Sequence, residues 1–270
     1  MAQKISVVWF KRDLRIHDHA PLAAACAVGL PILPLYVVEP DYWHQPFASR
    51  RHWHFIHDSL LELREDCANL GQPLVVRIGS ITNICAAIHK VFVLDGIYAH
   101  EETSNLWGYQ RDNDMRRWCR THAIRFDEFP TNGIVRRLPQ RDDWARLRNQ
   151  RMAAPLTPKP DTLLPLAIPI GDIPAKHDAL FGDDVPGLTQ KGGRRTGIKT
   201  LHSFLTERGS EYLYRLSAPG PSENYCSRLS THLTWGTLST REVVKSVQAR
   251  REQLSAAESK IWKRNLSAFI

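Results

Sequence analysis

The chain has 270 residues, of which 43% are hydrophobic and 24% are charged. This composition excludes a disordered, collagen-like or coiled-coil chain, and no stretch approaches the roughly 20 apolar residues of a membrane-spanning helix. The formal net charge of +8 is uneven, because residues 191–270 hold 14 Lys and Arg against 6 Asp and Glu, whereas residues 1–190 hold 22 of each. The basic C-terminal segment indicates either an anionic partner or a well-solvated helical surface.

The N-terminus does not look like a secretory signal. MAQKISVVWFKRDLR has a short apolar core that is followed at once by charges. The five cysteines lie far apart and none forms a Cys-x-x-Cys pair, which predicts reduced structural thiols rather than disulfides or a zinc ribbon. We therefore expect a soluble protein of the cytoplasm, without a membrane partner.

The first 130 residues alternate between short β-rich runs and helical patterns. Strands are predicted at 5–10, 32–38, 73–79, 91–100 and 123–129. Helices are predicted between them at 21–29, 49–70, 81–90 and 110–122. This alternation is typical of an α/β fold with a doubly wound, Rossmann-like parallel sheet of five strands, whose ligands lie at the carboxyl ends of the strands. Neither a Gly-x-Gly-x-x-Gly fingerprint nor a Walker-type phosphate loop follows any of these strands.

The rest of the chain has a different character. Residues 131–190 carry eight of the 17 prolines and show no sustained period, which predicts a long connector packed on the surface. Helices are predicted after it at 196–216, 238–254 and 260–270. We divide the chain into an α/β domain, a connector and the first part of an incomplete all-α domain, with bounds 1–135, 136–190 and 191–270.

Several ordered blocks resemble the photolyase/cryptochrome family of light-driven flavoproteins. VVWFKRDLRIHDHAPL (7–22) is similar to the opening strand and basic loop of that family, and residues 192–244 are similar to the first part of its flavin-binding helical domain. Between them, HEETSN (100–105), Arg111-Asp112 and NGIVRRL (132–138) fit the same pattern in the same order. The resemblance therefore covers nearly the whole chain.

The resemblance implies an α/β antenna domain joined by a connector to a helical domain that holds FAD. It implies a deoxyribodipyrimidine photo-lyase, which repairs pyrimidine dimers in damaged DNA by electron transfer from light-excited reduced FAD and acts as a monomer when complete. A cryptochrome-like blue-light photoreceptor without lyase activity, or a truncated inactive fragment of either, are the alternatives. Catalytic and dimer-reading residues are expected beyond Ile270, so the sequence does not separate these alternatives.

One short segment is expected to contact the FAD phosphates through hydroxyls and backbone amides. Its residues are Cys226, Ser227, Arg228, Leu229 and Ser230. The segment follows the turn-forming residues 219–222 and precedes a helical pattern, where a phosphate-binding concavity of the backbone would lie. Capping of the next helix by a serine is the alternative.

Other residues are assigned roles by the same resemblance. Tyr212 corresponds to a tyrosine that contacts the FAD phosphate or ribose, with Tyr214 as its competitor. The alternative is that either ring is a helix-face aromatic packed in the core. Arg215 and Arg241 are candidates for a basic surface that faces DNA phosphates, or else they keep exposed helices soluble.

A second chromophore is the remaining question. Glu101 and Glu102 follow the fourth strand at the ligand edge, where a carboxylate would hold the pterin ring of a folate antenna or simply pair with Arg111. The resemblance allows a folate, a deazaflavin, a flavin or no antenna at all. No metal site is predicted, since the histidines that cluster in the sequence do not have the spacing of metal ligands. These histidines are His44, His52, His54 and His57.

Overall fold

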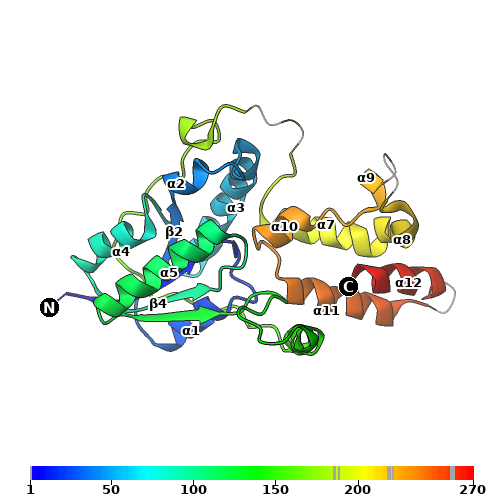
Figure 1. Cartoon of the computed structure of the whole chain (residues 1–270), viewed down its shortest axis with the longest axis horizontal. Helices are drawn as coiled ribbons and strands as arrows, with labels where there is room; N and C mark the ends of the chain where they lie inside the picture. The colour runs from blue at the N-terminus through cyan, green and yellow to red at the C-terminus, as the bar shows by residue number, and fades with distance from the viewer. Residues whose placement is uncertain (1, 185–186, 188, 218–219, 221, 256–258) are drawn as a thin grey trace.

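The structure is a computed structural model that describes residues 2–184, 187, 189–217, 220, 222–255 and 259–270. Pro219 and Pro221, which belong to the turn predicted before the 226–230 segment, lie outside the described residues. Figure 1 shows an α/β part that contains the N-terminus and a helical part that contains the C-terminus, with the chain between them crossing over the α/β part.

Five strands form one parallel sheet, which confirms the predicted fold class. They are β1 (Lys4–Phe10), β2 (Ile32–Val38), β3 (Val75–Ile78), β4 (Val93–His100) and β5 (Arg125–Phe129). Their order in the sheet is β3-β2-β1-β4-β5, with every neighbouring pair parallel. Because the chain moves outward from β1 in both directions, the switch point lies between β1 and β4, and a crevice for ligands is expected at the carboxyl ends there.

Helices cover both faces of the sheet (Figure 1). They are α1 (Ala20–Ala27), the short α2 (Pro40–Trp43), α3 (Arg50–Asn69), α4 (Ile81–His89) and α5 (Leu106–Thr121). One core joins the sheet to α1 and α3 around Phe10 and Trp53, and a second joins it to α4 and α5 around Trp9 and Met115. α5 begins four residues before the predicted start, because Asn105 caps it by accepting a hydrogen bond of 2.9 Å from the Gly108 amide.

The proline-rich connector is more ordered than its composition predicts. It contains η1 (Arg141–Asp143), α6 (Trp144–Ala153) and η2 (Ala179–Phe181), and α6 was missed because it buries only Met152 and so shows no apolar period. Beyond α6, Ile170 accepts a backbone hydrogen bond of 2.8 Å from Val76 of β3. The connector therefore covers the edge strand β3, which would otherwise expose unpaired backbone groups.

The helical part is built from short elements around one small core. They are α7 (Arg194–Thr206), η3 (Arg208–Glu211), α8 (Tyr212–Arg215), α9 (Ser222–Tyr225), α10 (Ser230–Thr234), α11 (Thr240–Gln253) and α12 (Ser259–Phe269). The prediction of one helix over 196–216 is wrong, because α7 ends at Thr206 and η3 turns the chain. Gly209 allows that turn, since a Cβ at this position would lie 2.5 Å from the Phe204 carbonyl oxygen. None of the described helices is long and apolar enough to cross a membrane.

Candidate functional site

The loop after β1 fastens the helical part to the carboxyl end of the sheet. The Leu14 amide donates a hydrogen bond of 3.1 Å to the Trp235 carbonyl, and the buried Arg15 donates one of 2.9 Å to the Gly236 carbonyl. Gly236 has φ = 63°, and a Cβ there would lie 2.2 Å from the carbonyl oxygen of Arg12. Only glycine allows this approach, so residues 235–236 lie directly against the strand end.

A buried carboxylate, Asp18, completes this joint from the other side. It accepts hydrogen bonds from the Ser239 hydroxyl at 2.6 Å and the Thr157 amide at 2.9 Å, and it pairs with the Arg241 guanidinium. Burial alone would raise the pKa of Asp18, but these hydrogen bonds outweigh it and hold the pKa below its ordinary value. Arg241 was predicted to face DNA; the structure places it in this joint, and its contact with DNA stays a prediction.

Three buried side chains, Asp13, His19 and His100, fix the same loop. Because His19 Nδ1 accepts from the Leu22 amide, its Nε2 carries the hydrogen and donates to Asp13 Oδ2 at 2.9 Å. His100 Nδ1 lies 2.6 Å from the same oxygen. Burial lowers the pKa of His100 to about 3, so both rings stay neutral at neutral pH. The ligand atoms lie close enough to hold a metal ion, but here they bond directly to one another.

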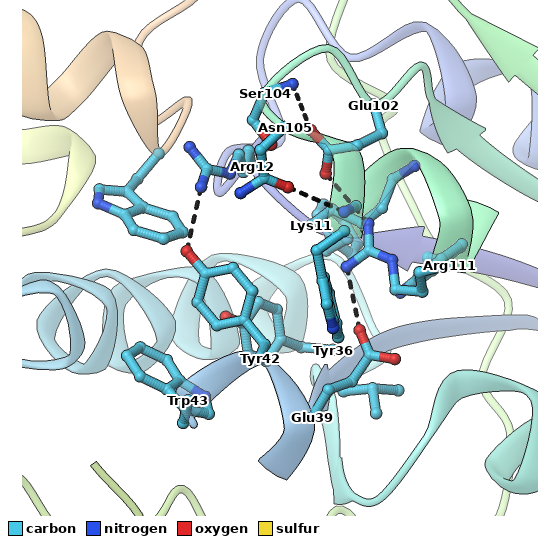
Figure 2. Close-up of a pocket in the computed structure, with 16 residues that line it drawn as sticks. Lys11, Arg12, Tyr36, Glu39, Tyr42, Trp43, Glu102, Ser104, Asn105 and Arg111 are labelled. Carbon is cyan, nitrogen blue, oxygen red and sulfur yellow. Dashed lines mark hydrogen bonds and ion pairs between the residues drawn. The ribbon is translucent and has the colours of Figure 1, made fainter. Parts of the chain in front are cut away.

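The crevice at the switch point is lined by Trp9, Glu39, Glu102, Trp107 and Arg111. Figure 2 shows Arg111 directed toward Glu39 and Glu102. Glu102, one of the two predicted antenna residues, accepts hydrogen bonds of 3.0 Å from the Thr103 and Ser104 amides and one of 3.1 Å from Arg111. Burial alone would raise the pKa of Glu102, but Arg111 and Lys11 lower it to about 2. Glu102 is thus an ionised, fully engaged carboxylate at the end of β4.

Glu101, the other predicted antenna residue, lies in different surroundings. Its Oε1 is 3.7 Å from Arg136 Nε, and its buried Oε2 has no hydrogen-bond partner within the described part of the chain. A cleft of about 220 Å³ opens beside it, between the loops after β1 and β4 on one side and residues 233–240 on the other. We call this the interdomain cleft. The two adjacent glutamates therefore differ. Both carboxylate oxygens of Glu102 accept hydrogen bonds, whereas Glu101 Oε2 accepts none from the described residues.

In the helical part, the 226–230 segment is held from behind by Arg208. The guanidinium donates to the carbonyls of Cys226 and Ser227, and it also donates to the Thr200 carbonyl of α7 at 2.9 Å. In a planar trans peptide the N–H points opposite to the C=O. Fixing these two carbonyls on Arg208 therefore turns the amides of Ser227 and Arg228 to the opposite side of the segment.

The backbone of the segment has the shape of an anion-binding concavity. Arg228 has φ = 59° and Leu229 has φ = −93°, an alternation of left- and right-handed residues that gathers successive amides on one side. The Leu229 side chain is completely buried in the helical core and anchors the turn. Ser230 then starts α10, whose first amides have no intrahelical acceptor. These donors and the two serine hydroxyls fit a phosphate group.

The structure separates the two competing tyrosines. The Tyr212 ring packs on Phe204 and Phe269, with ring centroids 5.5 Å and 5.6 Å away. Burial raises the pKa of the Tyr212 phenol, and the neighbouring Cys226 thiol adds to that rise. Tyr214 is 59% exposed and its hydroxyl accepts from Arg264. Tyr212 therefore packs in the core of the helical part and Tyr214 lies on the surface, and the contact of Tyr212 with FAD stays a prediction.

The predicted site residues thus fall into three places. Cys226–Ser230 and Tyr212 lie in the helical part, Glu101 and Glu102 lie at the end of β4, and Arg241 lies in the joint. Arg215 is on the surface of α8, paired with Glu211 at 2.8 Å. Arg208 was not predicted, and its only sequence signal is an arginine two residues after the end of α7.

Comparison with known proteins places this geometry in a family context. Residues 6–141 match the family model described as DNA photolyase. The protein named Cryptochrome DASH from Gloeobacter violaceus is 27% identical over 289 residues, which cover 97% of this chain and 57% of that protein.

Solved structures agree in fold. A cryptochrome from Synechocystis sp. superimposes with a TM-score of 0.78 at 20% identity, over 100% of this chain and 60% of that one. An archaeal photolyase from Sulfolobus tokodaii, described with two FAD molecules that imply a novel light-harvesting cofactor, superimposes with a TM-score of 0.67 at 23% identity, over 98% of this chain and 59% of that one. The chain therefore spans less than two thirds of the length of these relatives.

Proposed function

Because the chain belongs to the photolyase/cryptochrome family, we propose that it is a light-driven flavoprotein that holds FAD in its helical part and repairs pyrimidine dimers in DNA. The observation that carries this proposal is the 226–230 segment, whose amides and hydroxyls are arranged for a phosphate. When bound, reduced FAD would supply the light-excited electron that a dimer accepts. The protein's own residues supply binding, orientation and charge.

Several residues would hold the cofactor. The amides that follow Cys226 and Ser227, and the first amides of α10, would neutralise the pyrophosphate charge. Ser227 keeps its hydroxyl hydrogen for a phosphate oxygen, because its Oγ acts as acceptor toward the Leu229 amide at 3.4 Å. Arg208 would position these groups rather than touch the phosphate, since its guanidinium is occupied by carbonyl oxygens. Tyr212 would lie beside the phosphate or ribose.

We propose the interdomain cleft as the place of a second chromophore, with a folate as the chemical class. A pterin ring carries adjacent N–H donors on its aminopyrimidine edge, and Glu101 offers a buried carboxylate oxygen without a partner among the described residues. Removing this acceptor should lower folate binding without affecting FAD. The measurement is folate retained by Glu101→Gln compared with the unaltered protein.

We propose damaged DNA as the macromolecular partner and a monomer as the working form. A blue-light photoreceptor is the second candidate, favoured by the similarity to a protein named Cryptochrome DASH. Both functions use the same flavin site, so they differ in what the excited flavin does next. The whole protein's activity is therefore tested with substrate rather than by cofactor content.

The deciding experiment is a repair assay. Purified protein is supplied with FAD, reduced, mixed with an oligonucleotide that contains one thymine dimer, and kept under blue light or in the dark. Light-dependent loss of the dimer supports the lyase. Stoichiometric flavin with no loss of the dimer contradicts the lyase and favours the photoreceptor. Ser227→Ala combined with Ser230→Ala should remove activity, whereas the matched control Ser267→Ala on the exposed face of α12 should retain it.

A further inference from the structure

The crevice at the switch point is the place where a doubly wound sheet ordinarily binds a ligand. It opens between the segments that follow β1, β2 and β4, and α5 forms one wall. Topology predicts a ligand in this crevice, and a flavin or deazaflavin is one of the antenna classes that the family resemblance allows. What fills the crevice in this chain decides whether such a ligand can enter.

The crevice is occupied by a side chain of the protein itself. Arg111 reaches in from α5 toward Glu39 and Glu102 (Figure 2). Its guanidinium lies over two tryptophan rings, 4.7 Å from the centroid of Trp9 and 5.4 Å from that of Trp107. A guanidinium is planar, so its packing on these aromatic faces takes the position that a planar ring ligand would need.

The same guanidinium is held at its edges by three carboxylates. Arg111 lies 3.0 Å from Glu39 Oε2, 3.1 Å from Glu102 Oε2 and 3.0 Å from Asp112 Oδ1. The exposed fractions of these three carboxylate side chains are only 7%, 6% and 0%. Displacing Arg111 would leave Glu39 and Glu102 buried without their cation. A ligand that breaks one such pair by displacing Arg111 would bind about a hundredfold more weakly, or worse, than it would without that cost.

The space that remains is small. The cavity has a volume of about 40 Å³, against roughly 300–1,000 Å³ for pockets that hold ligands of drug size. Tyr42 narrows it further, since its ring lies 5.3 Å from that of Trp107 and its hydroxyl accepts from Arg12 at 3.1 Å. A three-ring ligand therefore has room in this cavity only if Arg111 leaves. Arg111 also lines a neighbouring cavity of about 210 Å³, together with Glu39 and Trp107.

We propose that Arg111 closes this crevice, so that the protein takes no flavin or deazaflavin at the end of its sheet. The similar Sulfolobus photolyase is described with two FAD molecules, and this chain would differ in holding only the one in its helical part. This inference rests on the proposed function for its meaning, because it restricts a second chromophore to the folate class in the interdomain cleft. Its test does not depend on the FAD phosphate segment.

The probe is riboflavin, which carries the three-ring system and no phosphate. Flavin fluorescence and its anisotropy report binding, since stacking on tryptophan quenches the emission. The opened variant combines Arg111→Ala with Glu39→Gln and Glu102→Gln, so that no buried carboxylate loses its cation; Asp112 keeps Lys11 at 2.6 Å. We expect no saturable riboflavin binding by the unaltered protein. The opened variant should bind riboflavin saturably, with quenched emission, at concentrations at least a hundredfold below the highest at which the unaltered protein shows no binding.

Two results would overturn the proposal. One is saturable riboflavin binding by the unaltered protein that Trp107→Phe weakens, a comparison that does not require the opened variant to fold. The other is failure of a folded opened variant to bind. Arg125→Ala is the matched control, because Arg125 stacks on Tyr98 of the same sheet, outside the crevice, and should change nothing. If the unaltered protein does not bind FAD, while riboflavin binds to the opened variant and not to the unaltered protein, the proposed function is contradicted and this inference is not.

Discussion

The crevice at the end of the sheet and the 226–230 segment both contain arginine side chains bound to oxygen atoms, but those oxygens are of different kinds. In the crevice, Arg111 and its carboxylates neutralise one another, and the side chains leave little room. In the 226–230 segment, Arg208 binds carbonyl oxygens from behind, and the amides on the other side are presented outward. The comparison teaches that charged residues at a ligand edge do not by themselves mark a ligand site. Backbone donors turned outward, as on the side of the 226–230 segment opposite Arg208, are the better mark.

The largest effect is expected from breaking the crevice network. Arg111→Ala should lower the free energy of unfolding by about 3–5 kcal/mol, because it leaves buried carboxylates without their cation. Arg125→Ala, whose guanidinium is half exposed, should cost less than about 1 kcal/mol. Denaturant unfolding of both variants measures this difference. Equal losses would show that the crevice network is no more than surface electrostatics.

The free energy of unfolding should depend on pH through the buried His100 beside the crevice. The pKa of His100 is lowered to about 3 in the fold, so between its ordinary value near 6.5 and 3 the unfolded chain binds more protons. Stability should therefore fall as the pH falls through this window, by up to about 1.4 kcal/mol per pH unit from this residue. Asp13 and Asp18, with lowered pKa values, add a further loss below pH about 4.

His100→Asn separates this contribution, because the amide replaces the Nδ1 donor and does not titrate. The free energy of unfolding should then depend less on pH between 6.5 and 3. His44→Asn, at an exposed position of α2's end, should leave the slope as it is. The same slope in all three proteins would contradict the assignment.

A smaller effect is expected at the joint between the α/β part and the helical part. Gly236→Ala forces a side chain into a left-handed residue with 2.2 Å to the Arg12 carbonyl, so the residues around 236 must move away from the strand end. We expect a loss of about 1–3 kcal/mol. The measurement is the free energy of unfolding. A loss near zero would show that the joint is loose and that the α/β part and the helical part are independent.

The smallest effect on the fold is expected at Arg215. Arg215→Gln should not change the melting temperature, because the side chain is exposed and its ion pair with Glu211 and its contact with the Tyr225 ring are both at the surface. If Arg215 contacts a DNA phosphate, the slope of log binding constant against log salt should decrease by about 1. An unchanged slope would remove Arg215 from the DNA-facing surface.

The fold of the first 130 residues could be predicted because its signals are local. Continuous apolar runs such as 32–38 are typical of strands buried on both faces, and helical periods separate them. Helix α6 and the break at Gly209 could not be predicted, because α6 buries one side chain and the break depends on close packing against Phe204.

The site was predictable only where a resemblance supplied it. The 226–230 segment and Tyr212 were assigned that way, and their contact with FAD stays a prediction. The position of Arg111 over Trp9 depends on contacts between β1 and α5, about 100 residues apart in sequence, which no local pattern encodes. For the same reason Arg241 could not be paired with Asp18 in advance.

The central claim is that FAD is held through its phosphates by the 226–230 segment. Titration of the purified protein with FAD, followed by flavin fluorescence, tests it most directly. Hydrogen bonds to charged groups contribute about 1.5–3 kcal/mol each, so the double variant Ser227→Ala with Ser230→Ala should bind FAD at least tenfold more weakly, and Ser267→Ala should bind it unchanged. Equal FAD affinity in the double variant and the unaltered protein would contradict the account.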